Sequence, residues 1–82
     1  MNLYNQDVVL LGAVIRQFRE EQGISQELLG EMASLHRTYI GSVERGERNP
    51  SFNSLNRILT SLKVSWSVFG KKLDSALSEK SK

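Results

Sequence analysis

Residues 25–48, SQELLGEMASLHRTYIGSVERGER, are the stretch that decides the fold of this chain. The apolar residues fall into two short patterns with a period near 3.6, first Leu28, Leu29, Met32 and Ala33, then Ile40 and Val43. Only Ser34-Leu35-His36 separates the two patterns, which leaves room for a sharp turn and nothing longer. Two brief helices joined so tightly must cross steeply. The stretch therefore predicts a helix-turn-helix, with Leu35 filling the angle between the helices.

The second of these helices keeps polar residues on its outer side. Arg37 and Thr38 lie at its start, where a recognition helix meets the edges of DNA bases, and Ser42 follows one turn later. Arginine binds guanine through O6 and N7, so Arg37 is the expected guanine reader. We therefore predict that Arg37, Thr38 and Ser42 read bases.

A second group of polar residues around the same helix is expected to contact DNA phosphates. Helix N-termini and guanidinium groups bind anions, so serines at helix starts and arginines beside the recognition helix suit this contact. For Tyr39 the sequence allows two readings, a ring whose hydroxyl reaches the DNA backbone or packing alone. The expected phosphate contacts are Ser25, Gln26, Tyr39, Arg45, Arg48, Asn49 and Ser54.

The combined pattern SQE–RTYI–ERGERNPS resembles the Xre/Cro family of helix-turn-helix proteins, which includes phage repressors. The run RTYIGSVERGERNPS is more similar still to controller proteins of restriction–modification systems, and the resemblance covers residues 12 to 69. Two positions depart from the pattern. Ser34 occupies a turn position that usually holds Gly, and Gly30 replaces the usual Ala, which fits sterically but weakens the helix. The resemblance implies an all-α, five-helix, lambda-repressor-like DNA-binding domain that works as a homodimer.

The resemblance also assigns roles to individual side chains. In similar proteins the residues that match Arg19 and Glu44 form a partly buried ion pair between the first helix and the recognition helix; the alternative is two unrelated surface charges. The matching glutamine of such proteins lies at the DNA backbone, whereas a plainly exposed Gln26 would do nothing. Acidic residues that match Glu27 and Glu31 touch the polymerase sigma subunit in phage repressors. The alternative is a solvated helix face, since these two glutamates are spaced i and i+4.

Length and composition bound the remaining possibilities. Eighty-two residues make one domain with a modest core, and the absence of cysteine excludes disulfides and thiolate metal sites, which suits a reducing cytoplasm. His36 is the only histidine, so no metal site or cofactor is expected, and no catalytic arrangement indicates an enzyme. Residues 1–35 carry a net charge of −3 and residues 36–63 a net charge of +3, which favours one DNA-facing side. We expect neither a signal peptide nor a membrane span.

The flanking segments are expected to support the helix-turn-helix. Residues 1–6 form a short N-terminal arm, the domain spans 7–77 and begins at Asp7 as an N-cap, and 78–82 are a polar, frayed tail. Ser51 and Ser65 are expected to cap two further helices. In the last helix the core can absorb only Trp66, so an exposed apolar patch remains, and such patches mark interfaces. The expected dimer interface is Trp66, Val68, Phe69 and Leu73.

These observations predict a sequence-specific transcriptional regulator that binds double-stranded operator DNA. By resemblance it controls a restriction–modification operon, activating its own promoter at low occupancy and repressing it when a second dimer binds the operator. A phage-type repressor or antitoxin regulator remains an alternative. A further alternative is a protein-interaction module that no longer binds DNA. The arginines on the DNA-reading side, Arg37, Arg45 and Arg48, argue against it.

Overall fold

The computed structural model describes residues 5–80, which form five helices and contain no strand. The helices are α1 (Gln6–Glu21), α2 (Gln26–Ala33), α3 (Arg37–Glu44), α4 (Phe52–Leu62) and α5 (Trp66–Lys80). The all-α, five-helix prediction is confirmed. Residues 1–4 of the expected arm and residues 81–82 of the expected tail lie outside the described part. Residues 78–80, expected to be frayed, continue α5 instead.

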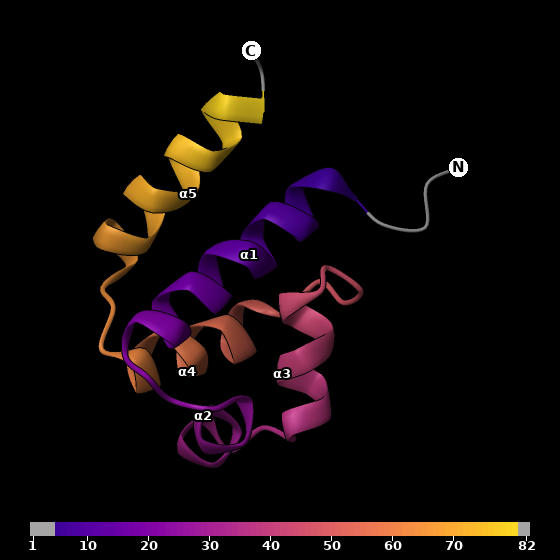
Figure 1. The fold of residues 1–82 in the computed structure, drawn as a ribbon, viewed down its shortest axis with the longest axis vertical. Coiled ribbons are helices and arrows are strands. Elements are labelled where there is room, and N and C mark those ends of the chain that lie inside the picture. The colour runs from indigo at the N-terminus through magenta and orange to yellow at the C-terminus, as the bar shows by residue number, and fades with distance from the viewer. Residues whose placement is uncertain (1–4, 81–82) are drawn as a thin grey trace.

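Helices α2 and α3 form the helix-turn-helix, and the other three hold it in place (Figure 1). Helix α1 packs on α3 and also on α5, which runs beside it, while α4 packs on α2. All five helices contribute to one core, because each directs an apolar side inward. Its largest fully buried members are Ile15, Leu29, Ile40, Val43, Ile58, Leu59, Leu62 and Phe69. Leu35, in the turn, packs partly buried against this core, as expected.

Side-chain caps decide where the helices begin. A cap accepts a hydrogen bond from one of the backbone N–H groups that the first turn leaves unpaired. At the recognition helix, His36 Nδ1 accepts from the backbone N–H of Thr38 at 3.0 Å. The first helix is capped by Asn5, whose Oδ1 accepts from the N–H of Asp7 at 2.7 Å, so the prediction of Asp7 as the cap was wrong. The remaining caps are Ser25, Ser51 and Ser65.

The turn between α2 and α3 depends on two small residues. Ser34 adopts the left-handed conformation with φ 57°, which costs about 1 kcal/mol in a residue other than glycine. The chain then returns over α2, and the Leu35 N–H donates to the Gly30 carbonyl at 2.8 Å. A Cβ on Gly30 would lie 2.5 Å from the Leu35 carbonyl oxygen. This close approach therefore requires glycine at position 30. The low helix propensity of glycine, taken alone, gives no indication of that requirement.

Two apolar patterns read from the sequence differ in the structure. Of the four residues in the apolar pattern of α2, Leu29 and Ala33 are buried, whereas Leu28 and Met32 are 40% and 47% exposed, because a short helix that packs on one side buries only a narrow stripe. In α5 the expected order of the aromatic residues is reversed: Phe69 is 2% exposed and Trp66 is 41% exposed. Phe69 packs against Phe18 of α1. Phe69 therefore takes the position in the core that the sequence predicts for Trp66.

The crossing of α1 over α3 rests on Gly12. A Cβ at this position would lie 2.1 Å from the Val43 carbonyl oxygen, so the two backbones must separate to admit one. We expect Gly12→Ala to lower the free energy of unfolding by about 1–3 kcal/mol, as is usual for overpacking. Gly70→Ala is the matched control, because nothing lies within 4 Å of its Cβ position, and it should stabilise by up to about 1 kcal/mol. Urea unfolding of both variants checks this, and equal stabilities would contradict the close approach.

Candidate nucleic-acid interface

The expected base-reading residues lie at the start of α3. Arg37 and Thr38 are exposed in its first turn, directly after the His36 cap that sets where the helix begins. Ser42 is half-buried, and its hydroxyl donates to the Tyr39 carbonyl at 2.7 Å. The Ser42 oxygen can therefore accept a further hydrogen bond but has no proton left to donate.

Two arginines extend the polar surface beyond the C-terminal end of α3. Arg45 is held by Glu47, with Nε and Nη2 donating to the two carboxylate oxygens at 2.9 and 3.1 Å. This hydrogen bonding lowers the pKa of Glu47 below its ordinary value. The guanidinium carbon of Arg48 lies 5.4 Å from the centroid of the Tyr39 ring, a cation–π distance. Tyr39 thus both packs against the core and positions an arginine.

Serines at the N-termini of α2 and α4 include two of the predicted phosphate contacts, Ser25 and Ser54. Ser25 Oγ accepts from the Leu28 N–H at 3.0 Å. Ser51 Oγ accepts from the Ser54 N–H at 3.1 Å and donates to Ser54 Oγ at 3.1 Å. The Ser54 hydroxyl therefore keeps its proton for another acceptor, such as a phosphate oxygen. Asn49 is exposed in the loop before α4.

Arg19 and Glu44 form a buried ion pair beneath the recognition helix. Arg19 Nε and Nη2 donate to Glu44 Oε2 and Oε1 at 2.6 and 3.0 Å, and Nη1 donates to the Ile24 carbonyl at 2.8 Å. The two residues are 9% and 7% exposed. The hydrogen bond to Glu44 raises the pKa of Arg19 above its ordinary value, against the opposing effect of burial. The pair joins α1 and the α1–α2 loop to the end of α3.

Gln26 joins this ion pair, which the sequence reading missed. Its Nε2 donates to Glu44 Oε1 at 3.0 Å, so one carboxylate receives hydrogen bonds from α1 and from α2. The spacing of the three residues along the chain carries no signal of this contact, because it depends on how α1, α2 and α3 meet. One of the two N–H groups of this amide is therefore engaged inside the protein, and the phosphate contact expected of Gln26 stays a prediction.

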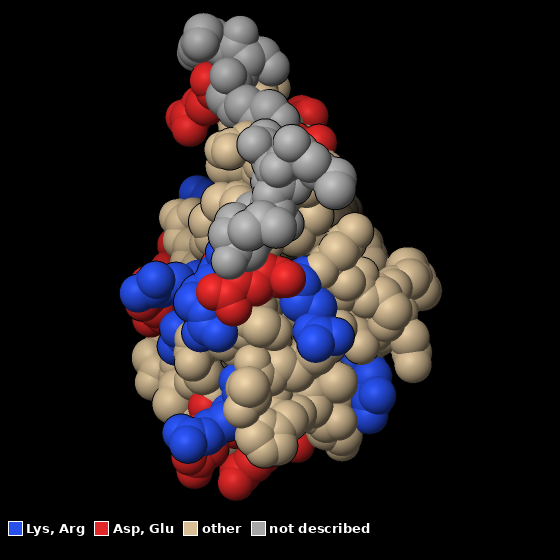
Figure 2. Space-filling view, turned by 90° about the vertical axis from the view of Figure 1, so that its right-hand side faces the viewer, with Lys and Arg blue, Asp and Glu red and all other residues tan. Residues whose placement is uncertain are grey.

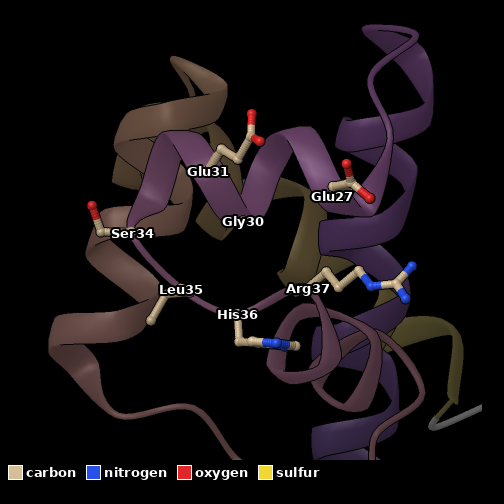
Figure 3. Close-up of a pocket in the computed structure, with 7 residues that line it drawn as sticks. All are labelled: Glu27, Gly30, Glu31, Ser34, Leu35, His36 and Arg37. Atoms are coloured by element: carbon tan, nitrogen blue, oxygen red, sulfur yellow. The ribbon is translucent and has the colours of Figure 1, made fainter.

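The charged residues around the turn lie on two sides of it. Glu27 and Glu31 project from α2, while His36 and Arg37 follow the turn below (Figure 3). Both glutamates are exposed, as expected, although the neighbouring Leu28 is exposed too. On the side of the molecule that carries α3, basic side chains form separate patches with an acidic patch between them in the middle, and further acidic side chains lie near the lower edge and near the top (Figure 2). The basic charge is therefore patchy rather than continuous.

Other kinds of site find little support in residues 5–80. Within this range no three His, Cys, Asp or Glu side chains are grouped so that they could hold a metal ion. None of the helices in the same range is both long enough and apolar enough to cross a bilayer. The polar surface around α3 carries the base-reading residues that the sequence predicts.

Comparison with known proteins identifies a family model and two control proteins that are similar to this chain. A family model described as "Helix-turn-helix" matches residues 15–69. The control protein C.SmaI of Serratia marcescens is 45% identical over 56 residues, which are 68% of this chain and 67% of that protein. The control protein C.BamHI of Bacillus amyloliquefaciens is 42% identical over 57 residues, 68% of this chain and 70% of that protein.

A solved structure extends the likeness to the whole fold. It is the restriction–modification controller protein C.Esp1396I, crystallised as a tetramer in complex with its natural 35 base-pair operator. That chain superposes with a TM-score of 0.84 at 36% identity, covering 88% of this chain and 95% of that one. The chain described here therefore belongs to the helix-turn-helix family of DNA-binding regulators and is homologous to restriction–modification controller proteins.

Proposed function

We propose that this protein is a transcriptional regulator that binds the operator of a restriction–modification operon in the cytoplasm and controls that operon. The observation that carries the proposal is the capped start of α3, which holds Arg37 and Thr38 exposed at the position where this motif meets base edges. Likeness to C.SmaI and C.BamHI along two thirds of each protein supports the same conclusion. Activation at low occupancy and repression by a second dimer are part of the proposal.

The experiment is a selection of binding sites from random-sequence DNA, followed by gel shifts on the gene's own upstream region at stated salt. We expect one recovered motif with two half-sites, and a copy of it upstream of the gene. A motif without an upstream copy would favour a phage-type repressor or antitoxin regulator. Recovery of no motif would contradict the DNA-binding proposal and favour a protein-interaction module.

We propose that an exposed aromatic pair forms the homodimer contact. Phe52 is 73% exposed and stacks on Trp66 with ring centroids 5.2 Å apart, and the Trp66 indole N–H donates to Asn56 Oδ1 at 2.8 Å. Val68, also exposed, lies two residues further along α5 and so points to a different side of that helix. Phe69 is buried within one subunit and offers no free surface, whereas Leu73 is half-buried and keeps part of its surface exposed.

Phe52→Asp tests this contact. The charge would be buried at the interface without a partner, so we expect the dimer dissociation constant to rise by at least about tenfold, the equivalent of about 1.4 kcal/mol. The fold should persist, because Phe52 is largely exposed and Asp suits the first turn of a helix. Asn53→Asp adds the same charge one residue away and is the control. Sedimentation measures both, and an unchanged Phe52→Asp dimer would place the interface elsewhere, with Val68 the next position to test.

The pair Glu27 and Glu31 is proposed to contact the sigma subunit of RNA polymerase during activation. Both carboxylates are exposed on α2, which begins at the Ser25 cap beside the proposed DNA surface. Changing both to glutamine should preserve operator affinity or raise it slightly, because repulsion from phosphate falls, while promoter stimulation drops towards the basal level. In vitro transcription at matched occupancy measures the effect. Full stimulation by the double variant would leave the two glutamates as a solvated helix face.

A further inference from the structure

The recognition helix begins at a cap that a single proton can remove. His36 Nδ1 accepts a hydrogen bond from the Thr38 N–H at 3.0 Å. A ring nitrogen accepts only while it carries no proton, so this contact requires the neutral imidazole. The other four helices are capped by amide or hydroxyl oxygens, those of Asn5, Ser25, Ser51 and Ser65. Such oxygens do not titrate near neutral pH. Within residues 5–80, the start of α3 is therefore the one helix start whose cap responds to mild acid.

Charges of both signs surround the His36 ring. The ring is exposed, and the charged side chains that line the same hollow are Glu27 and Glu31 of α2 and Arg37 of α3 (Figure 3). The two carboxylates favour a positive charge on the ring, whereas Arg37 opposes it. The N-terminal end of α3 opposes it as well, because the helix dipole is positive there. Protonation of the ring and capping of the helix therefore compete at this residue.

We propose that protonation of His36 couples the selectivity of DNA binding to pH. The neutral ring fixes the first turn of α3, which holds Arg37 and Thr38 at the position of the proposed base contacts. In the protonated ring Nδ1 is a donor that faces the Thr38 N–H, a second donor, so the cap is lost and the first turn frays. The added positive charge attracts DNA of any sequence through its phosphates. Acid therefore weakens selective binding and strengthens unselective binding. The inference rests on the proposed DNA-binding function.

The same cap affects the stability of the protein without DNA. The cap stabilises α3 only while the ring is neutral, so its contribution is present above the titration range of histidine and is lost as the pH falls through that range. Histidine is the side chain whose ordinary pKa lies between about 5 and 8, and the chain has one histidine and no cysteine. A change of stability in this range that disappears when residue 36 is substituted therefore has a single source.

The first experiment compares three proteins between about pH 8 and about pH 5.5 at constant ionic strength. His36→Asn keeps a cap that does not titrate and retains every other ionisable group, and His36→Ala has no cap at any pH. Binding is measured on the DNA site selected from random sequence and on a random duplex. The ratio of the two wild-type affinities should fall by at least about fivefold, because each subunit of the proposed dimer loses a cap worth about twofold or more. The ratio should stay constant for His36→Asn, and lower but likewise constant for His36→Ala.

The second experiment is thermal unfolding without DNA over the same pH range. The melting temperature of the wild type should fall relative to that of His36→Asn by about 4–8 °C, the shift expected from a lost cap. If the wild type and His36→Asn respond to pH alike, the response comes from groups that both proteins share and the proposal is overturned. A wild-type affinity ratio that does not change with pH would overturn it as well. Absence of selective binding at every pH would instead refute the proposed function, while the melting comparison would still test the cap.

Discussion

Arg37→Ala should abolish selective binding of the operator while leaving weak, salt-sensitive binding to random DNA. Arg37 is exposed in the first turn of α3, where a bidentate contact to guanine O6 and N7 is worth about 1–3 kcal/mol of discrimination. In a dimer both half-sites lose this contact, so the loss of binding free energy is counted twice. We therefore expect the operator to lose about 2–6 kcal/mol of binding free energy, which is roughly 30-fold to 20,000-fold in affinity.

Binding isotherms on operator and random duplexes, measured across a series of salt concentrations, check this expectation. Arg16→Ala is the control, because it removes the same charge from α1, where Arg16 pairs with Glu20 in water. It should reduce both affinities little. If Arg37→Ala weakens operator and random DNA by the same factor, Arg37 contacts a phosphate and does not read a base.

Glu44→Ala should destabilise the protein even without DNA. Arg19 is 9% exposed in the folded protein, so the substitution leaves a buried guanidinium without its carboxylate, and removing one partner of a buried pair costs about 3–5 kcal/mol. Gln26 loses its acceptor in the same step. For a domain of this size the melting temperature should fall by more than about 10 °C.

Thermal unfolding followed by circular dichroism measures this fall. The matched control is Glu20→Ala, which breaks the exposed Arg16–Glu20 pair on α1, with side chains 60% and 54% exposed. A pair in water contributes about 0–1 kcal/mol, so this variant should melt close to the wild type. Equal melting temperatures for Glu44→Ala and Glu20→Ala would show that burial of the first pair adds nothing to stability.

The sequence predicts most of the fold because helix starts are local. Ser25, Ser51 and Ser65 each precede an apolar pattern of helical period, and each caps the helix expected after it. The turn is local as well, since three residues between two patterns permit one geometry. The ion pair of Arg19 with Glu44 is not local, because the two residues are 25 positions apart. Its prediction comes from the family resemblance and not from the spacing of the residues.

What the sequence conceals depends on how helices meet. Trp66 and Phe69 lie on the same stripe of α5, and which of them is buried depends on where that helix crosses Phe18. No sequence pattern marks Gly12 or Gly30 as a contact position. Each nevertheless allows the backbone oxygen of another residue to approach its Cα closely. The contact of Gln26 with Glu44 likewise appears only when α1, α2 and α3 are assembled.

The Arg45–Glu47 pair has a consequence for how this protein responds to ionic strength. Glu47 occupies two donors of Arg45, so within the free protein a carboxylate takes the place that we predict for a phosphate on DNA. When DNA exchanges with Glu47, the phosphate releases a condensed cation, but the freed carboxylate attracts one from solution. The net release of cations is therefore smaller than the number of arginines at the surface suggests. We therefore expect Glu47 to compete with phosphate for Arg45 and to weaken unselective attraction to DNA more than attraction to a site with base contacts.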